Sequence, residues 1–244
     1  MDALLDIRNV SCQKERAARF QNLNLTVNSG EIGAVYGGVN SGKTALVDLI
    51  AGFAKPKNGQ IFRVAEVAVV PQQFIFYPDL TVAENLEFCA AVNDFPESRL
   101  PEIIAATNLT GWEKIRAGRL PNALKAMLQL ACAMAREFDL LVLDEVTAAL
   151  DTNLKQAFWK LLGRLRDAGK GILLVTGLWG DANRCDWVIN LSAEEVFARE
   201  PQSVGKKAKK GAVAVNENPM VRPLETNPAP QPQDSKVGSA EVIL

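Results

Sequence analysis

Residues 37–44 read GGVNSGKT and fit the pattern G-x-x-x-x-G-K-[ST]. The stretch lies between a strand-like run, EIGAVYG (31–37), and a helix-like run, KTALVDLIAGF (43–53). In that position the glycines let backbone amides turn inward onto phosphate oxygens, so we predict a phosphate-binding loop. Lys43 would reach the β- and γ-phosphates, and the Thr44 hydroxyl would ligate magnesium. An ordinary glycine-rich turn is the competing interpretation, and the flanking strand and helix weigh against it.

Two carboxylates end the apolar run LLVLDE (140–145). Asp144, at the end of a buried strand, is placed to hold the magnesium ion through water. Glu145 points toward the γ-phosphate and can polarise an attacking water. A strand-end acidic pair that merely faces solvent is the alternative, and the phosphate loop elsewhere in the chain makes it the weaker one.

Strand-like and helix-like runs alternate along most of the chain, which predicts an α/β fold with a parallel sheet. LLVLD, GILLVT and DWVINL are continuous apolar runs, typical of strands covered on both faces. Near the start, LLDIRNV (4–10) and LNLTV (23–27) are predicted strands separated by a polar segment.

A helical block at 81–119 is predicted as an insertion into this fold. The next helix begins at LPNAL (120–124), where proline suits the first turn and Asn122 is expected as the N-cap. After about Leu191 the pattern breaks down, and 198–244 is predicted to be a disordered tail because it holds KKAKK and many prolines. KKAKK could contact anionic lipids, although a solvated tail is the favoured interpretation.

Composition excludes several kinds of chemistry. The net charge is −1, with both signs interspersed, which argues against nucleic acid as a partner. The absence of histidine excludes any histidine base or metal ligand. Four widely spaced cysteines are typical of reduced core residues in a cytosolic protein: Cys12, Cys89, Cys132 and Cys185. No apolar run could cross a bilayer, and Met1 leads into the first strand without a signal-peptide pattern, so we expect a peripheral protein at the cytoplasmic face of the inner membrane.

Over residues 1 to about 191, the order of motifs resembles the nucleotide-binding subunits of ABC transporters. GGVNSGKT is similar to the Walker A segment and LLVLDE to the Walker B segment. VVPQ (69–72) is similar to the Q-loop, LTVAENL (80–86) to the entry of the helical subdomain, and EVTAALD (145–151) to the segment that ends in the D-loop. The resemblance implies an ABC-type P-loop NTPase domain at 1–197. Its parallel core would carry N-terminal antiparallel strands and an inserted helical subdomain at about 81–137.

In that family, two domains enclose two ATP molecules and drive a pair of integral-membrane subunits. The resemblance therefore implies ATP and Mg²⁺ as ligands, Glu145 as the catalytic residue and Asp151 as the D-loop acid. Gln72 would join Thr44 and Asp144 at the metal. Phe74, Phe76 and Tyr77 could receive a helix of the membrane subunit or could pack inside the domain. The ATP contacts implied are Gly37, Gly38, Val39, Asn40, Ser41, Gly42, Lys43, Thr44, Ala45 and Gln72.

The chain departs from the family at positions that close the site. The signature L-S-G-G-Q falls on Leu120, Pro121, Asn122, Ala123 and Leu124. The hydroxyl is lost there, Pro121 has no N–H, and Ala123 adds a methyl group. Gly177 stands where the family usually has a histidine that contacts the γ-phosphate. The stretch 12–14 lacks the aromatic residue that commonly stacks on adenine, and Ala45 lacks a second hydroxyl.

These losses predict ATP binding with weak hydrolysis, and they favour a heterodimer with an intact ABC subunit over a homodimer. The leading hypothesis is an ATP-binding subunit of an exporter or lipid-handling transporter. Two alternatives stay open: a regulatory or structural pseudo-ATPase that pairs with an intact ABC ATPase, and an ABC ATPase without a membrane partner.

Overall fold

The computed structural model describes residues 3–14, 17–63 and 66–191. The predicted tail at 198–244, including KKAKK, lies outside these residues. Within the described ranges, no helix is long and apolar enough to cross a membrane. The helices are α1 (Lys43–Ala51), α2 (Val82–Val92), α3 (Leu100–Ala106), α4 (Asn122–Met134), α5 (Thr152–Asp167) and α6 (Trp179–Ala182), with short 3₁₀ turns η1 (Glu97–Arg99), η2 (Ala117–Arg119) and η3 (Val146–Ala149).

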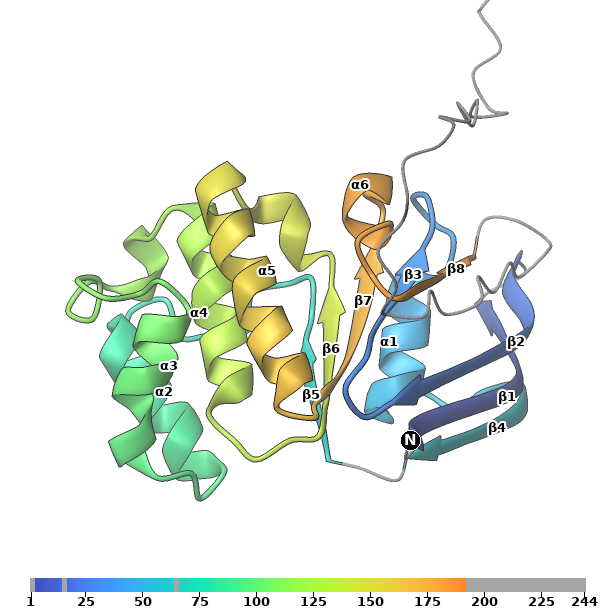
Figure 1. Ribbon diagram of the computed structural model, residues 1–244, viewed down its shortest axis with the longest axis horizontal. Helices are drawn as coiled ribbons and strands as arrows, with labels where there is room; N and C mark the ends of the chain where they lie inside the picture. Colours follow the sequence, from blue (N-terminus) through green and yellow to red (C-terminus); the bar gives the residue numbers. More distant parts are fainter. Residues whose placement is uncertain (1–2, 15–16, 64–65, 192–244) are drawn as a thin grey trace, which may run out of the picture. The chain divides into compact units, whose positions relative to one another are not determined.

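A parallel sheet of five strands occupies the centre of the fold (Figure 1). Its order is β5-β6-β7-β3-β8, so β7 pairs with β6 on one side and with β3 on the other. Every residue of β6 and β7 is buried, as expected for strands covered on both faces. The predicted parallel core is therefore confirmed. The strand bounds are β3 (Ile32–Tyr36), β5 (Val67–Val70), β6 (Leu140–Asp144), β7 (Gly171–Thr176) and β8 (Trp187–Asn190).

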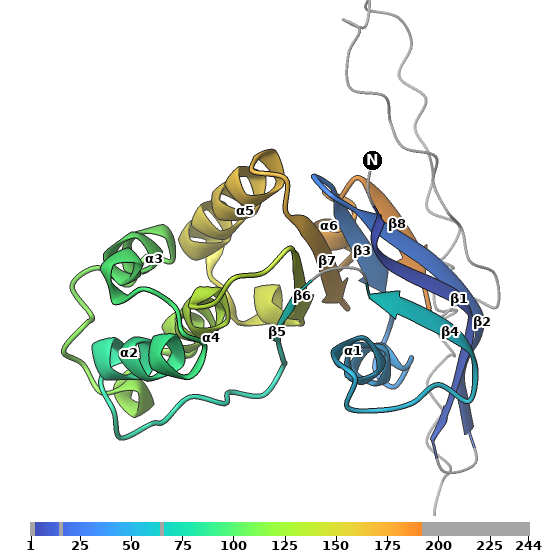
Figure 2. The ribbon, with the colours of Figure 1, turned by 90° about the horizontal axis from the view of Figure 1, so that it is seen from below.

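Alternate side chains of the sheet pack into two different hydrophobic clusters, because successive residues of a strand point to opposite faces. Leu141 and Leu143 of β6 join the cluster of α2, α3, α4 and α5. Leu140 and Val142 join the cluster formed by α1 and the N-terminal strands. Figure 2 shows the same division, with α2 to α5 on one side of the sheet and α1 on the other.

The second sheet is antiparallel, with the order β2-β1-β4, and consists of β1 (Ala3–Lys14), β2 (Ala17–Asn28) and β4 (Asn58–Arg63). The prediction that a polar segment at 11–22 separates two strands was wrong, because β1 and β2 extend into that segment from both sides. Their ladder continues through the pair Cys12↔Phe20 with several register shifts. Backbone pairing in an antiparallel sheet can run beyond the buried face, so polar side chains did not end these strands.

The helical block lies between β5 and β6, as an insertion requires. Thr81 caps α2 by accepting from the Glu84 N–H, and the Glu84 carboxylate accepts from the Thr81 N–H in return. The predicted cap at Asn122 was wrong. Pro121 is the N-cap residue of α4, Asn122 is already helical, and no side chain caps this helix.

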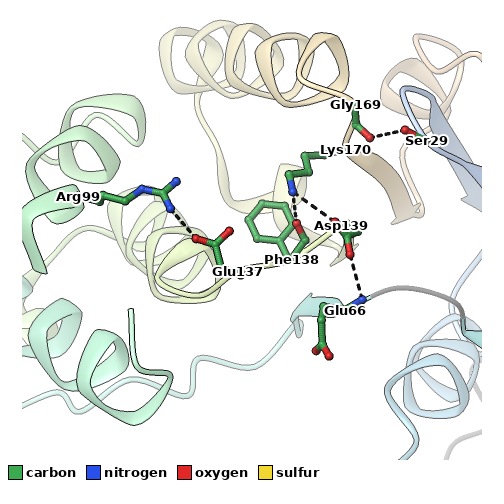
Figure 3. Close-up of polar contacts among 8 residues, drawn as sticks. All are labelled: Ser29, Glu66, Arg99, Glu137, Phe138, Asp139, Gly169 and Lys170. Atoms are coloured by element: carbon green, nitrogen blue, oxygen red, sulfur yellow. Dashed lines mark hydrogen bonds and ion pairs between the residues drawn. The ribbon is translucent and has the colours of Figure 1, made fainter. Parts of the chain in front are cut away.

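Polar contacts join the turns at the amino-terminal edge of the parallel sheet (Figure 3). The Lys170 ammonium donates to the Phe138 carbonyl and lies 3.5 Å from the Asp139 carboxylate. The other Asp139 oxygen accepts from the Glu66 N–H, and the Asp139 carbonyl accepts from the Gly171 N–H. Asp139 therefore links the segment before β5 to the start of β7, which fixes the register in which β6 enters the sheet.

Gly33 in β3 provides a test of this packing. A Cβ atom at this position would lie 2.0 Å from the Trp187 ring, so Gly33→Ala should destabilise the protein by about 1–3 kcal/mol through overpacking. Thermal or denaturant unfolding measures the effect. Gly163→Ala is the matched control, since its Cβ meets open space in α5 and alanine favours helix. In a Trp187→Leu background, Gly33→Ala should cost much less stability, because the ring that the new Cβ atom meets is gone. An equal loss of stability in both backgrounds would contradict the overpacking of Gly33 against Trp187.

Candidate nucleotide-binding site

The phosphate loop (residues 37–44) leads from β3 into α1 and depends on two glycines. Gly42, the N-cap residue of α1, has φ 101°, a left-handed conformation that favours glycine. A Cβ atom on Gly37 would lie 2.3 Å from the Ser41 hydroxyl. That hydroxyl is inaccessible to solvent and has no hydrogen-bond partner in the described part of the chain. A closely folded loop with an unpaired buried hydroxyl fits a phosphate group.

Lys43 is buried and its ammonium group lies within the curve of the phosphate loop. It donates to the carbonyl oxygens of Gly37 at 2.6 Å and Gly38 at 2.7 Å. It also lies 3.3 Å from Glu145 Oε1, at the end of β6. The structure therefore brings together Lys43 of the phosphate loop and Glu145 of LLVLDE, two motifs that were predicted to share one site.

Asp144 ends β6 with a side chain almost fully removed from solvent, and neither carboxylate oxygen makes a hydrogen bond of normal geometry to a described residue. The pKa of Asp144 is raised from 3.8 to about 6, mainly by burial and secondly by the neighbouring negative charge of Glu145. The Thr44 hydroxyl and the Lys43 ammonium oppose this shift in pKa. A buried carboxylate beside the Thr44 hydroxyl is a set of oxygen ligands that suits Mg²⁺.

Glu145 connects the ends of three strands. Its backbone has φ 55°, a left-handed conformation uncommon for a residue other than glycine. Its N–H donates to the Val175 carbonyl of β7 at 2.9 Å, and its Oε2 accepts from the Gly177 N–H at 3.1 Å. Strained backbone of this kind persists where the surroundings hold it, and it is concentrated at functional sites.

Gly177 lies directly after β7, between the phosphate loop and Glu145. A Cβ atom there would meet Glu145 Oε1 at 3.4 Å and the Gly37 carbonyl at 3.5 Å, which are ordinary contacts. A larger side chain could therefore start from this position without displacing the backbone. The predicted histidine position thus adjoins the site, although the chain places glycine there.

Two other predicted residues, Gln72 and Asp151, make no hydrogen bond or ion pair with the described residues of this cluster. Gln72 is exposed in the β5–α2 segment (residues 71–81), and its side chain makes no hydrogen bond to any described residue. Asp151 caps α5 by accepting from the Leu154 N–H at 2.9 Å. Within one chain, Asp151 therefore has a structural partner that the motif alone did not reveal.

The predicted signature segment at 120–124 forms the turn into α4 and the first residues of that helix. Leu120 and Leu124 are buried, whereas Pro121 and Asn122 are exposed. Among the described residues, no hydrogen bond or ion pair joins these five residues to the phosphate loop. Leu120, Leu124 and the partly buried Ala123 pack against the helical cluster, so only Pro121 and Asn122 face the surroundings.

The aromatic residues of the β5–α2 segment were predicted either to receive a helix of a membrane subunit or to pack inside the domain, and they differ in burial. Phe76 packs against the helical cluster, whereas Phe74 and Tyr77 are exposed. Two residues that hold this segment were missed in the sequence: Gln129 of α4 and Asn85 of α2, both buried amides. The only sequence signal was Gln129, a polar residue in the apolar run 126–134, whereas Asn85 lies between two glutamates of α2.

The parallel sheet, the phosphate loop and the strand-end carboxylates define a P-loop nucleotide-binding domain. The family described as "ABC transporter" matches residues 20–148, more than half of the 244 residues. The chain belongs to the ABC transporter family and carries its ATP-binding domain.

Similarity to individual proteins agrees with this assignment. The chain is 27% identical over 199 residues to the probable multidrug ABC transporter ATP-binding protein YbhF of Escherichia coli (strain K12), with 75% of this chain and 34% of that protein covered. It is 30% identical over 201 residues to the Nod factor export ATP-binding protein I of Burkholderia lata, with 75% of this chain and 66% of that protein covered. The chain thus spans about a third of the length of the first of these relatives and about two thirds of the length of the second.

Solved structures show the same fold. An ATP-binding subunit of an ABC transporter aligns with a TM-score of 0.72 at 24% identity, covering 81% of this chain and 90% of that one. The dimeric bacterial ABC transporter cassette MJ0796 aligns with a TM-score of 0.70 at 22% identity, covering 79% and 96%. The predicted fold class is confirmed.

The Asp144 carboxylate provides a pH-dependent test of the metal-free protein. Its pKa is raised on folding, so its stabilising contribution is complete below about pH 3.8 and is lost as the pH rises through about 6. Asp144→Asn should therefore be more stable than the wild type at pH 8, and the difference should shrink toward pH 5. Denaturant unfolding in the presence of a chelator measures both proteins at each pH. A difference that does not change with pH would contradict the raised pKa.

Proposed function

We propose that this chain is the ATP-binding subunit of an ABC membrane transporter, in which Mg-ATP binding closes a dimer that acts on membrane subunits. The observation that carries the proposal is the cluster of Lys43, after β3, with Asp144 and Glu145, at the end of β6. Family membership supports it. The relatives named for multidrug transport and Nod factor export support an exporter-type subunit.

The residues of the cluster have distinct roles in this proposal. Amides of the phosphate loop and the Lys43 ammonium hold the β- and γ-phosphates, while Thr44, Asp144 and Gln72 hold Mg²⁺. The ion neutralises charge on the phosphates when it is bound. Lys43 pairs with Glu145 at 3.3 Å, so an incoming triphosphate competes with Glu145 for the same ammonium group. Binding would thereby release the Glu145 carboxylate to polarise a water.

Weak hydrolysis follows from the groups that the chain lacks. Gly177 supplies an N–H to Glu145 but no side chain to contact a γ-phosphate. Pro121 offers no backbone donor, and Ala123 brings a methyl group where a phosphate would approach. Removing one donor from a developing negative charge typically costs about 3 kcal/mol in the barrier, so the loss of several donors favours slow turnover.

The partners proposed are integral-membrane transporter subunits and a second ABC ATP-binding subunit. A homodimer would carry both faults in each composite site, whereas an intact partner would leave one fault per site, so we favour a heterodimer. Exposed Phe74 and Tyr77 offer an apolar surface to a membrane subunit. This arrangement would place the chain on the cytoplasmic face of the membrane.

Replacement of Lys43 tests nucleotide binding directly. Lys43→Ala should weaken Mg-ATP binding at least about tenfold, because charge-assisted hydrogen bonds contribute about 1.5–3 kcal/mol. Equilibrium titration with a fluorescent ATP analogue measures the affinity. Lys114→Ala is the control, since it removes an exposed lysine from the helical block. Equal affinity in both variants would refute the proposed function.

Restoring a histidine tests the cause of weak hydrolysis. Gly177→His has room at its Cβ atom and should raise ATP turnover of the assembled complex about tenfold or more. Gly180→His is the control, because it adds histidine at an open position after β7. Phosphate release measures turnover.

The same assay separates an ATPase from a scaffold. The turnover gained by Gly177→His should disappear when Glu145→Gln is added, since the amide that replaces the carboxylate cannot accept a proton from water. If Gly177→His adds no turnover and Glu145→Gln changes nothing in either background, the pseudo-ATPase interpretation is favoured. The changed signature residues are the observation on which that second candidate function rests.

A further inference from the structure

Gln129 is a buried amide of α4 whose polar atoms are all directed to one backbone segment. Its Nε2 donates to the carbonyl oxygens of Pro71 at 2.6 Å and Gln73 at 2.8 Å. Its Oε1 accepts from the Ile75 N–H at 3.2 Å. The side chain is 3% exposed, so these contacts form away from water, where an unpaired amide is costly.

Asn85 of α2 holds the other end of the β5–α2 segment in the same manner. Its Oδ1 accepts from the Tyr77 N–H at 2.8 Å, and its Nδ2 donates to the Tyr77 carbonyl at 2.9 Å and the Thr81 carbonyl at 2.9 Å. The segment has no regular hydrogen-bonding pattern of its own over most of its length. Its backbone groups from Pro71 to Tyr77 therefore bond to these two side chains, whereas the Pro78 and Leu80 carbonyls also accept from N–H groups of η2.

The position of Gln72 gives Gln129 a role beyond packing. Gln72 lies between the two residues whose carbonyls Gln129 holds, so its backbone cannot shift independently of α4 while both bonds persist. The same helix begins at the changed signature. A displacement of Gln72 toward a metal-bound triphosphate would therefore act on α4 through the Gln129 side chain.

We propose that Gln129 is a positioning residue that fastens the backbone around Gln72 to α4, so that nucleotide contact at Gln72 is transmitted to the helix that starts at LPNAL. The inference rests on the proposed function, because it takes Gln72 to meet the nucleotide. It adds a specific mechanical link, which the sequence motifs do not contain. Asn85 bonds to the backbone of residues 77–81 and makes no hydrogen bond to the carbonyls on either side of Gln72, so its part is separate.

Hydrogen exchange tests the link without nucleotide. Gln129→Leu keeps a similar volume and removes all three hydrogen bonds, so exchange of the Ile75 amide should become about tenfold faster. Met127→Leu, at a fully buried position in the same helix, is the packing control and should leave this amide unchanged. Asn85→Leu should speed exchange at Tyr77 while Ile75 stays protected. An Ile75 amide that exchanges equally in wild type and Gln129→Leu overturns the proposal.

A double-mutant cycle tests the transmission to nucleotide. Gln72→Ala should weaken Mg-ATP binding in the wild type, and the same change should have at least about threefold less effect in the Gln129→Leu background, because Gln72 is then already misplaced. Equal effects in both backgrounds overturn the proposed transmission, even if Ile75 is deprotected. A merely structural role would lower stability without this coupling.

The conservative variant separates hydrogen bonding from volume. Gln129→Glu keeps an oxygen that can accept from the Ile75 N–H but places a second oxygen against the carbonyls of Pro71 and Gln73. Compared with Gln129→Leu, this variant should restore protection of the Ile75 amide only at low pH, where the new carboxyl group is protonated and can donate. Protection that is equal at pH 5 and pH 8 would contradict the assigned contacts. If the wild type binds no nucleotide and Lys43→Ala changes nothing, the proposed function fails, whereas the Ile75 exchange still decides the link between Gln129 and the segment.

Discussion

The pairing of β7 with both β3 and β6 is the constraint on which the site depends. Parallel strands lie about 4.8 Å apart, so one intervening strand separates the phosphate loop after β3 from the carboxylates at the end of β6 by roughly two strand spacings. Lys43 and Glu145 bridge that distance with their side chains. Gly177, which follows β7, lies between them. The polar centre is thus assembled from residues at or after the carboxyl ends of three adjacent strands.

Much of the fold follows from the sequence because the responsible forces are local or periodic. The continuous apolar runs predicted buried parallel strands, and β6 and β7 are buried throughout. The glycine pattern predicted the phosphate loop, and the left-handed Gly42 explains one of its glycines. Strand ends were less predictable: β1 and β2 extend through a polar stretch because each strand supplies the other's backbone partners. The start of α4 was also mispredicted, because Pro121 is its N-cap residue although proline has no side-chain group that could cap a helix.

The contacts that escaped prediction join residues far apart in the chain. Gln129 binds a segment more than fifty residues away, and nothing in a run of apolar helical residues indicates which backbone a buried amide meets. Glu145, which has a left-handed backbone, likewise donates its N–H to β7, a strand that comes later in the sequence. Sequence motifs identified which residues carry the chemistry, but tertiary pairing decides how each is held.

The division of the sheet between two hydrophobic clusters has a consequence for how this domain can vary. Leu141 and Val142 are neighbours in β6, yet one packs with the helical block and the other with α1 and the antiparallel strands. A change of volume at Leu141 must be accommodated by the helices, while a change at Val142 must be accommodated by the opposite layer. Substitutions at adjacent positions of β6 are therefore expected to occur independently of each other. Each should instead co-vary with residues of the layer against which that position packs.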